Sequence, residues 1–445
     1  MNVVPQDINA YIVQRLESTL APEVRHLLGR AVRIAAQHGW EIYVVGGYLR
    51  DLLLSIPDYD IDLSVVGDAP MLARLLAEGA DAEVEVHERF GTATLRLRGV
   101  HERLDFVTAR REWYPVPGAL PSVQPGSIYD DLARRDFTVN AMAFALTPPP
   151  PAQSGIAGGS LIDPHGGLAD LRQALIRVLH DRSFRDDPTR ILRAVRLARR
   201  LDFAIEEHTL QLLEQAVREG ALRTVSVDRL THELLMVMKE PQAYAMLAEL
   251  ERLGVLRAIH PELHWPYARH EKVISDEVDQ TLTPEQRQSA YLAVIGSLHP
   301  PARAEQLARF LRLPAPQIRL MRDAAKLVKL LPQLAVPHLK PSQAYALLKG
   351  VDASALEAYT RISLPLPGGE QARRWLESYL RELRHTKPTI TGHHLRSLGI
   401  APGPVYRRLL DDLLAAKLDG ELPTEEEERA FIQEWLARER IRADL

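Results

Sequence analysis

The stretch EIYVVGGYLRD at residues 41–51, followed by DIDLSVV at residues 60–66, determines the fold of this chain. Each segment contains a short β-type apolar run, and the first run ends at Gly46 and Gly47, where a turn is expected. The patterns around them alternate between strand and helix, with β-type runs at residues 93–97 and 103–107 and helical spacing at residues 48–54 and 71–78. Residues 1–145 are therefore predicted to form a mixed α/β unit.

Asp60 and Asp62 are the first candidates for chemistry. Alternation along a strand places both carboxylates on one face, where they can hold Mg²⁺ together, and Asp105 on a neighbouring strand could complete the site. Two metals suit in-line displacement at phosphorus, and Gly46 and Gly47 let the backbone approach phosphates. Each motif also has a plainer interpretation, since Gly-Gly is often a simple turn and Asp-x-Asp a solvated face or a helix cap.

The rest of the chain is predicted to be helical. Residues 3–38 have helical spacing, and residues 147–159 are rich in proline and glycine, which predicts a surface loop. Beyond Gly167 the β-type runs almost disappear, and leucine, alanine, arginine and glutamate recur at helical spacing. The expected architecture is an α/β head followed by a long helical remainder.

Composition narrows the class of protein. The chain has 445 residues, 46% hydrophobic content, no cysteine and a formal net charge of −4. Cysteine chemistry is thereby excluded, and the N-terminus lacks a signal-peptide pattern. No apolar stretch reaches the roughly 20 residues of a membrane span, so we expect a cytoplasmic protein. Nucleic acid, if bound, would contact a local basic surface.

Four motifs in order resemble the class II tRNA nucleotidyltransferases, which are the CCA-adding enzymes and their poly(A) polymerase relatives. The first combines residues 45–51 with Asp60 and Asp62. The others are RRDFTVNAMA at residues 134–143, DPHGGLADL at residues 163–171 and DDPTRILRAVR at residues 186–196. The resemblance is thin beyond about residue 265 and returns near the C-terminus, in ITGHHL and LGIAPGP, at residues 390–395 and 398–404.

The resemblance implies an α+β fold. It consists of a polymerase-β-type head with a mixed sheet at residues 1–150, a helical neck at 151–235, a helical body at 236–335 and a helical tail at 336–445. It implies addition of CMP and AMP from CTP and ATP to the 3′ end of tRNA, with Mg²⁺ bound at the active site. Body and tail would hold the acceptor and TΨC arms of tRNA by shape.

The resemblance also implies roles for individual residues. Arginine forks suit triphosphate oxygens, and a carboxylate suits a ribose hydroxyl, although Arg-Arg-Asp is also common as a surface ion-pair cluster. Asp187 and Arg190 stand one helical turn apart and would read the incoming base, whereas the plainer interpretation is an i,i+3 salt bridge. The catalytic residues are then Asp60, Asp62 and Asp105, and the nucleotide-binding residues are Gly46, Gly47, Arg50, Arg134, Arg135, Asp136, Asn140, Asp187, Arg190, Arg193 and Arg196.

Several specificities stay open within this class. A Pro/Gly-rich segment at residues 110–131 is present, and relatives that add only CC typically lack a flexible loop there. Full CCA addition and A-only addition both remain, and the second would require a separate CC-adding enzyme. A poly(A) polymerase is less well supported, because the acidic chain ends without a basic tail. A helical RNA-binding protein with an inactive head is a further alternative, which the intact Asp60 and Asp62 disfavour.

Overall fold

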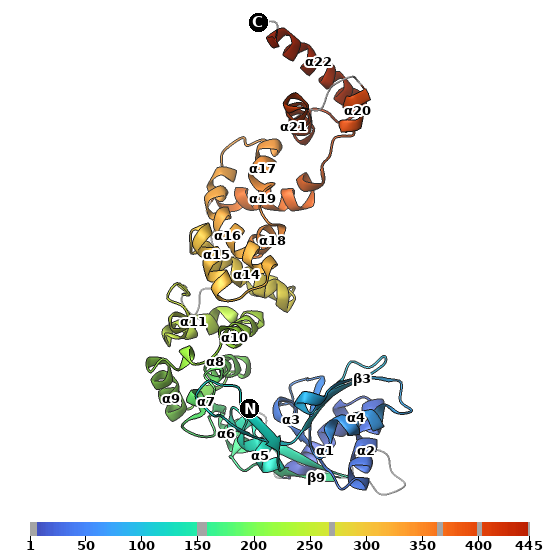
Figure 1. Cartoon of the computed structure of the whole chain (residues 1–445), viewed down its shortest axis with the longest axis vertical. Coiled ribbons are helices and arrows are strands. Elements are labelled where there is room, and N and C mark those ends of the chain that lie inside the picture. Colours follow the sequence, from blue (N-terminus) through green and yellow to red (C-terminus); the bar gives the residue numbers. More distant parts are fainter. Residues whose placement is uncertain (1–6, 149–157, 267–271, 363–367, 398–402, 444–445) are drawn as a thin grey trace. The chain divides into compact units, whose positions relative to one another are not determined.

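The computed structural model describes residues 7–148, 158–266, 272–362, 368–397 and 403–443 (Figure 1). Chain contacts divide it into two units. The first contains Met1–Glu233 and Arg252–Ile259, and the second contains Leu234–Glu251 and His260–Leu445. The finer division into head, neck, body and tail stays a prediction.

A seven-stranded sheet forms the core of the first unit, in the order β3-β4-β5-β2-β1-β8-β9. β2 and β5 pair in parallel, whereas the other neighbouring strands pair antiparallel, which confirms the predicted mixed sheet. The strands are β1 (Glu41–Val45), β2 (Asp60–Val66), β3 (Ala82–His87), β4 (Thr92–Leu97), β5 (Arg103–Thr108), β8 (Ala143–Thr147) and β9 (Gly158–Ile162). A separate hairpin pairs β6 (Arg110–Trp113) with β7 (Ser122–Pro125).

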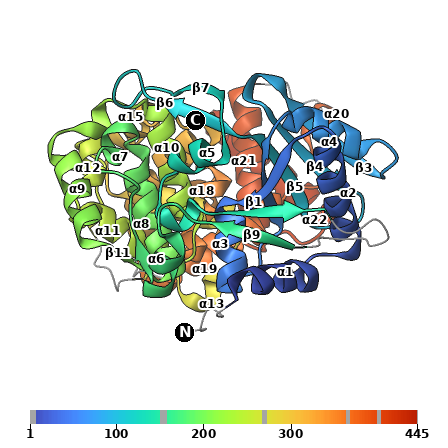
Figure 2. The same ribbon diagram turned by 90° about the horizontal axis from the view of Figure 1, so that it is seen from below.

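Helices cover both faces of this sheet. α4 packs on β3, β4 and β5, and α2 packs on α4 and β1, whereas α5 packs near β2 and β6. Figures 1 and 2 show α6, α8 and α9 together on one side of the strands, and α2 and α4 on the other side. The main helices of the unit are α1 (Ile8–Thr19), α2 (Pro22–Gln37), α3 (Gly46–Leu54), α4 (Ala69–Ala77), α5 (Ile128–Ala133), α6 (Gly167–Gln173), α7 (Ser183–Asp186), α8 (Thr189–Leu201), α9 (Glu207–Arg218) and α12 (Val255–Ile259).

Strand β2 shows how the sequence sets the two faces of the sheet. Ile61, Leu63 and Val65 are fully buried, and because side chains alternate along a strand they share one face. Asp60 and Asp62 therefore lie on the opposite face. Burial of the three apolar side chains fixes the orientation of the strand and hence the side on which the carboxylates lie.

One expectation from the sequence is confirmed and another needs correction. The helical stretch predicted at residues 3–38 is present as two helices, α1 and α2, which separate at Leu20–Ala21 because Pro22 disfavours a helical conformation in the preceding residue; residues 3–6 lie outside the described residues. The loop predicted at residues 147–159 contains a strand end, since Gly158 and Gly159 begin β9 and pair with β8. Residues 149–157 of that loop lie outside the described residues.

The second unit is helical where the structure describes it. It begins within α10 (Val227–Lys239), and at its centre α16 packs against α14, α15 and α18. A separate apolar cluster, which includes Ile390, Leu409 and Leu413, joins the last helices. Among the described residues, no helix is both long and apolar enough to cross a membrane. The helices are α11 (Ala243–Arg252), α13 (Asp276–Asp279), α14 (Pro284–Ser297), α15 (Pro301–Phe310), α16 (Ala315–Leu334), α17 (Pro341–Leu348), α18 (Ala353–Arg361), α19 (Gly369–Arg381), α20 (Gly392–Ser397), α21 (Pro404–Leu418) and α22 (Glu425–Ala443).

The two glycines of β9 provide a test of sheet packing. A Cβ at Gly159 would lie 2.1 Å from the Ala145 carbonyl oxygen, whereas a Cβ at Gly158 would meet its nearest atom, in Thr147, at 3.7 Å. We expect Gly159→Ala to lower the free energy of unfolding by about 1 to 3 kcal/mol, because the backbone must shift to relieve the overlap. Gly158→Ala should change it by less than about 0.5 kcal/mol. Urea unfolding of both variants measures this, and equal midpoints would contradict the described pairing of β8 with β9.

Candidate active site

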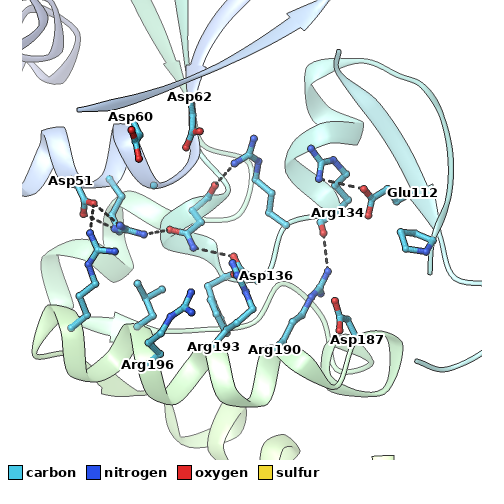
Figure 3. Close-up of a pocket in the computed structure, with 18 of the residues that line it drawn as sticks. Asp51, Asp60, Asp62, Glu112, Arg134, Asp136, Asp187, Arg190, Arg193 and Arg196 are labelled. Atoms are coloured by element: carbon cyan, nitrogen blue, oxygen red, sulfur yellow. Dashed lines mark hydrogen bonds and ion pairs between the residues drawn. The ribbon is translucent and has the colours of Figure 1, made fainter. Parts of the chain in front are cut away.

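A polar cavity of about 640 Å³ opens in the first unit beside the carboxylate face of β2 (Figure 3). Its lining comes from α3, β2, β5, the β6–β7 hairpin, residues 134–140, α8 and Arg229 of α10. The predicted site residues that line it are Gly47, Arg50, Asp60, Asp62, Arg134, Arg135, Asp136, Asn140, Asp187, Arg190, Arg193 and Arg196. Segments far apart in the sequence thus meet in one cavity.

The predicted carboxylates lie on neighbouring parallel strands. Asp62 of β2 is the register partner of Asp105 of β5, and Asp60 is the partner of Arg103. Both oxygens of Asp105 have protein partners, because Oδ1 accepts from Thr94 Oγ1 at 2.6 Å and Oδ2 from Arg103 Nε at 3.0 Å. Of the three predicted catalytic carboxylates, Asp60 and Asp62 line the cavity and Asp105 does not (Figure 3).

Negative charge accumulates around Asp62. The pKa of Asp62 is raised to about 6, mainly by burial and in part by the carboxylates of Asp105 and Asp58, against the opposing charge of the Arg135 guanidinium. A divalent cation would relieve this repulsion, and carboxylate oxygens are the ligands that Mg²⁺ prefers. In the described part of the chain, no group of three or more His, Asp or Glu side chains is arranged to hold a metal. The carboxylate pair thus fits a metal held jointly with substrate oxygens.

Gly46 is required by close packing at this point. Its φ is +71°, and a Cβ there would lie 2.6 Å from Arg135 Nη1 and 3.2 Å from Asp62 Oδ2. Arg135 itself is held by Asp131, which accepts from its Nη2 at 2.9 Å. Glycine at residue 46 therefore lets a guanidinium approach the carboxylate of Asp62.

A buried hydrogen-bond chain links α3 to α8. Arg50 forms a bidentate ion pair with Asp51 and donates through Nη1 to Asn140 Oδ1 at 2.5 Å. Asn140 donates to Asp136 Oδ1 at 3.0 Å, and Arg193 donates to Asp136 Oδ2 from Nη2 at 2.5 Å and from Nε at 3.0 Å (Figure 3). The chain of residues 50, 140, 136 and 193 is continuous.

Asp136, which was expected to contact a ribose hydroxyl, is buried and already has several protein partners. Burial raises its pKa, but the charge of Arg193 and the hydrogen bond from Asn140 outweigh burial and hold the pKa well below its usual range. Its Oδ1 also accepts from the backbone N–H of Phe137 at 2.9 Å. In this arrangement the carboxylate positions Arg193 and Asn140, and its contact with a ribose hydroxyl stays a prediction.

Asp187 and Arg190 both face the cavity, but not as a helical pair (Figure 3). Asp187 is extended, with φ −136°, and precedes α8, so the expected single helical turn between the two residues is wrong. The alternative interpretation, a salt bridge between Asp187 and Arg190, is also wrong, because Asp187 pairs with Arg229 at 2.8 Å. Arg190 donates to Ser183 Oγ at 2.7 Å and to the Arg134 carbonyl at 2.8 Å.

Other polar residues of the cavity had no assigned role in the sequence. Arg103 contacts two of the acids, and Arg229 joins Asp187 to the Gly118 carbonyl, which it reaches at 3.3 Å. Glu112 pairs with Arg110 at 2.7 Å. The signal for Arg103 was its position two residues before Asp105 on a strand, which puts both on one face.

Two family models match the chain. One, described as the poly A polymerase head domain, matches residues 42–177, and another, described as a probable RNA- and SrmB-binding site of polymerase A, matches residues 202–265.

The chain is also similar to tRNA-processing proteins along most of its length. It is 34% identical to an A-adding tRNA nucleotidyltransferase of Geobacter sulfurreducens, over 87% of this chain but only 44% of that protein. It is 32% identical to an A-adding tRNA nucleotidyltransferase of Halalkalibacterium halodurans, over 95% of both chains. A CC-adding tRNA nucleotidyltransferase of Deinococcus radiodurans is 31% identical, over 89% of this chain and 90% of that one.

Solved structures agree with these relatives. An apo CCA-adding enzyme matches with a TM-score of 0.74 and 31% identity, over 96% of this chain and 98% of that one. The Thermotoga maritima CCA-adding enzyme complexed with tRNA matches with a TM-score of 0.69 and 30% identity, over 96% and 98% of the two chains.

The raised pKa of Asp62 predicts a pH-dependent gain in stability when its charge is removed. The pKa is about 6 in the folded chain and about 4 in an unfolded one, so ionised Asp62 destabilises the folded state above pH 6. Asp62→Asn should raise the free energy of unfolding at pH 8 by about 1 to 2 kcal/mol. The gain should fade as the pH drops from 6 toward 4, because the wild-type carboxyl then binds its proton.

Urea unfolding in EDTA at pH 8 and pH 4.5 measures this gain. Asp81→Asn is the matched control, since Asp81 is a largely exposed acid whose nearest partner, Arg98, lies at 3.6 Å. It should leave both midpoints unchanged. An Asp62→Asn variant that is less stable than the wild type at pH 8 would show that the ionised form is favoured by folding.

Proposed function

The chain belongs to the family of tRNA nucleotidyltransferases and poly(A) polymerases, and from this membership we propose that it transfers AMP from ATP to the 3′ end of tRNA. The observation that carries the proposal is the cavity that contains both the Asp60–Asp62 pair and the Asp187–Arg190 pair. One pair fits the reacting phosphate, and the other fits the base of the incoming nucleotide. Nucleotide choice then needs no nucleic acid template.

The reaction joins the 3′ oxygen of the tRNA to the α-phosphorus of the nucleotide. The bond from that phosphorus to the oxygen that bridges it to the β-phosphorus breaks, pyrophosphate leaves, and the proton of the 3′ hydroxyl is released to water. Mg²⁺ held by Asp60 and Asp62 would supply charge stabilisation for both oxygens of this displacement. Asp105 supports the pair from the neighbouring strand, where it is the register partner of Asp62.

The chain's own cations bind and orient the triphosphate in this proposal. Arg50, Arg135, Arg193 and Arg196 line the cavity, and guanidinium forks match phosphate oxygens. Each is restrained by a protein carboxylate or amide, such as Asp136 for Arg193, so little side-chain entropy is lost on binding. Gly47, with no side chain over the cavity, leaves its backbone open to the phosphates.

Base selection is assigned to Asp187 and Arg190. A carboxylate accepts and a guanidinium donates, so the two offer the edge pattern that hydrogen bonding to a nucleobase needs. Arg229 and Ser183 fix their orientations through the contacts at 2.8 and 2.7 Å. A fixed edge discriminates between bases better than a mobile one, because the wrong base leaves buried polar groups unpaired.

The RNA partner is tRNA in this proposal, bound through its acceptor and TΨC arms. Relatives of similar length are named for tRNA, and one matching structure is complexed with tRNA. A duplex is recognised largely by shape and backbone contacts, which suits a helical unit in a net acidic chain. tRNA maturation places the protein in the cytoplasm.

Full CCA addition is the second candidate. The two solved structures described above are CCA-adding enzymes, whereas two relatives that match along nearly their whole length are named for adding A or CC alone. The segment between β5 and α5, whose counterpart CC-adding relatives typically lack, is present here as the β6–β7 hairpin. A-only addition would imply a separate CC-adding enzyme in the same cell.

Nucleotide incorporation separates these activities. With purified protein and Mg²⁺, three tRNA transcripts ending before CCA, after C and after CC would each receive CTP, ATP or both. We expect a single A to be added to the transcript ending in CC, and no CMP to be added to any. Completed CCA on all three transcripts would establish the second candidate instead.

The same assay has a variant control. Asp60→Ala should reduce incorporation by more than about a hundredfold, because a metal-binding carboxylate is removed, while tRNA binding in a filter assay is retained. Asp181→Asn, at an exposed acid that pairs with His208, should leave incorporation unchanged. Long A tracts on unrelated RNA would identify a poly(A) polymerase, and no incorporation by the wild type would refute nucleotidyl transfer.

Asp187→Ala should weaken base discrimination. A hydrogen-bonded base edge is worth about 1 to 3 kcal/mol, so kcat/KM for ATP should fall about tenfold to a hundredfold with little change in KM for tRNA. The control is Asp186→Ala, which removes a neighbouring acid that pairs with Arg182 at 3.3 Å. Competition between ATP and CTP measures the preference. If both variants changed it equally, Asp187 would have no special role in base selection.

A further inference from the structure

Arg103 contacts two of the three acids of the proposed catalytic site. Its Nε lies 2.9 Å from Asp60 Oδ1, with which it forms an ion pair, and donates a hydrogen bond to Asp105 Oδ2 at 3.0 Å, so one guanidinium pairs with two carboxylates. The register of β2 and β5 determines both contacts. Arg103 is the register partner of Asp60, and Asp105 follows two residues later on the same face of β5.

The two arginines beside the carboxylates differ in how firmly they are held. Arg135, next to Asp62, is mostly buried and is tied to Asp131 and to the Asn140 carbonyl. The side chain of Arg103 is 41% exposed, and that of Asp60 is 51% exposed. Solvent can therefore replace the Arg103–Asp60 contact at small cost, whereas Arg135 cannot leave its site as easily.

A divalent cation and Arg103 require the same carboxylate. Mg²⁺ binds oxygens at about 2.0 to 2.1 Å, so a cation on Asp60 would lie within a few ångströms of the guanidinium. Like charges at such a distance repel, although water around these half-exposed groups screens the repulsion. Binding of a cation thus requires Arg103 to move or to find a new anionic partner, and a nucleotide triphosphate in the same cavity is such a partner.

We propose that Arg103 is a positioning residue that competes with the divalent cation for Asp60 and so couples metal binding to nucleotide binding. The inference rests on the proposed function, because it takes Asp60 and Asp62 as metal ligands. The site then has low affinity for metal alone. Its affinity rises when triphosphate oxygens bind both the cation and the released guanidinium. Premature occupation of the carboxylates by metal is disfavoured.

Mn²⁺ binding to the full chain, followed by electron paramagnetic resonance, tests this competition. Arg103→Gln should bind Mn²⁺ about threefold to fivefold more tightly than the wild type without nucleotide, since an exposed charge contact is removed. With a non-hydrolysable ATP analogue present, the difference should shrink. The matched control is Arg96→Gln on β4, which removes the same charge from the register partner of Arg103 but from a residue that pairs with Glu85.

Each outcome decides the proposal. Tighter binding in Arg103→Gln, with Arg96→Gln unchanged, supports it. Equal changes in both variants would reveal only a general charge effect, and weaker binding in Arg103→Gln would show that Arg103 instead holds Asp60 in place for the metal; either result overturns the proposal. If the wild type binds Mn²⁺ and Asp60→Asn does not, the metal site stands even where the Arg103 proposal fails. If the wild type holds no Mn²⁺ either alone or with the ATP analogue present, the proposed function and this inference fail together.

Discussion

The parallel pairing of β2 with β5 is the constraint on which the proposed active site depends. Parallel neighbours need a crossover, and α4, β3 and β4 supply it between the two strands. Their register places Asp62 opposite Asp105, and a shift by one residue would turn the carboxylates of β2 toward the face on which α4 packs. Burial of Leu63 and its neighbours opposes that shift, so packing on one face of the sheet maintains chemistry on the other.

A second constraint is the buried polar chain from Arg50 through Asn140 and Asp136 to Arg193. Removing Asn140 or Asp136 would leave a neighbouring buried polar group with fewer partners, which costs more than the bond itself is worth. Because the chain joins α3, the segment after α5, and α8, it fixes the distance between the carboxylate pair and the helix that follows Asp187. Phosphate and base can then be held at a defined separation, and this geometry substitutes for a template.

The sequence revealed the parts of the fold that local patterns determine. β1, β2, β4 and β5 were predicted because apolar residues alternate or cluster there. Nearly all of the site residues that the motifs predicted also line the cavity. β9 escaped prediction because Gly158 and Gly159 are typical of turns, and only pairing with β8 makes them a strand. Asp187 was assigned to a helix because helical spacing does not show that the chain is extended before α8. The contacts of Arg103 depend on strand register, which no local pattern encodes.

Charge balance explains how a net acidic chain can bind nucleotides and RNA. Ten arginines and seven acidic side chains line the cavity, so it is locally basic although the chain carries a net charge of −4. Most of these arginines are paired with the acids, and pairing lowers the cost of holding so many cations close together. Arg190 donates instead to a hydroxyl and a carbonyl oxygen, which leave its charge unneutralised. The excess of arginines over acids therefore concentrates positive charge in the cavity, and the acidic remainder of the surface disfavours non-specific retention of RNA.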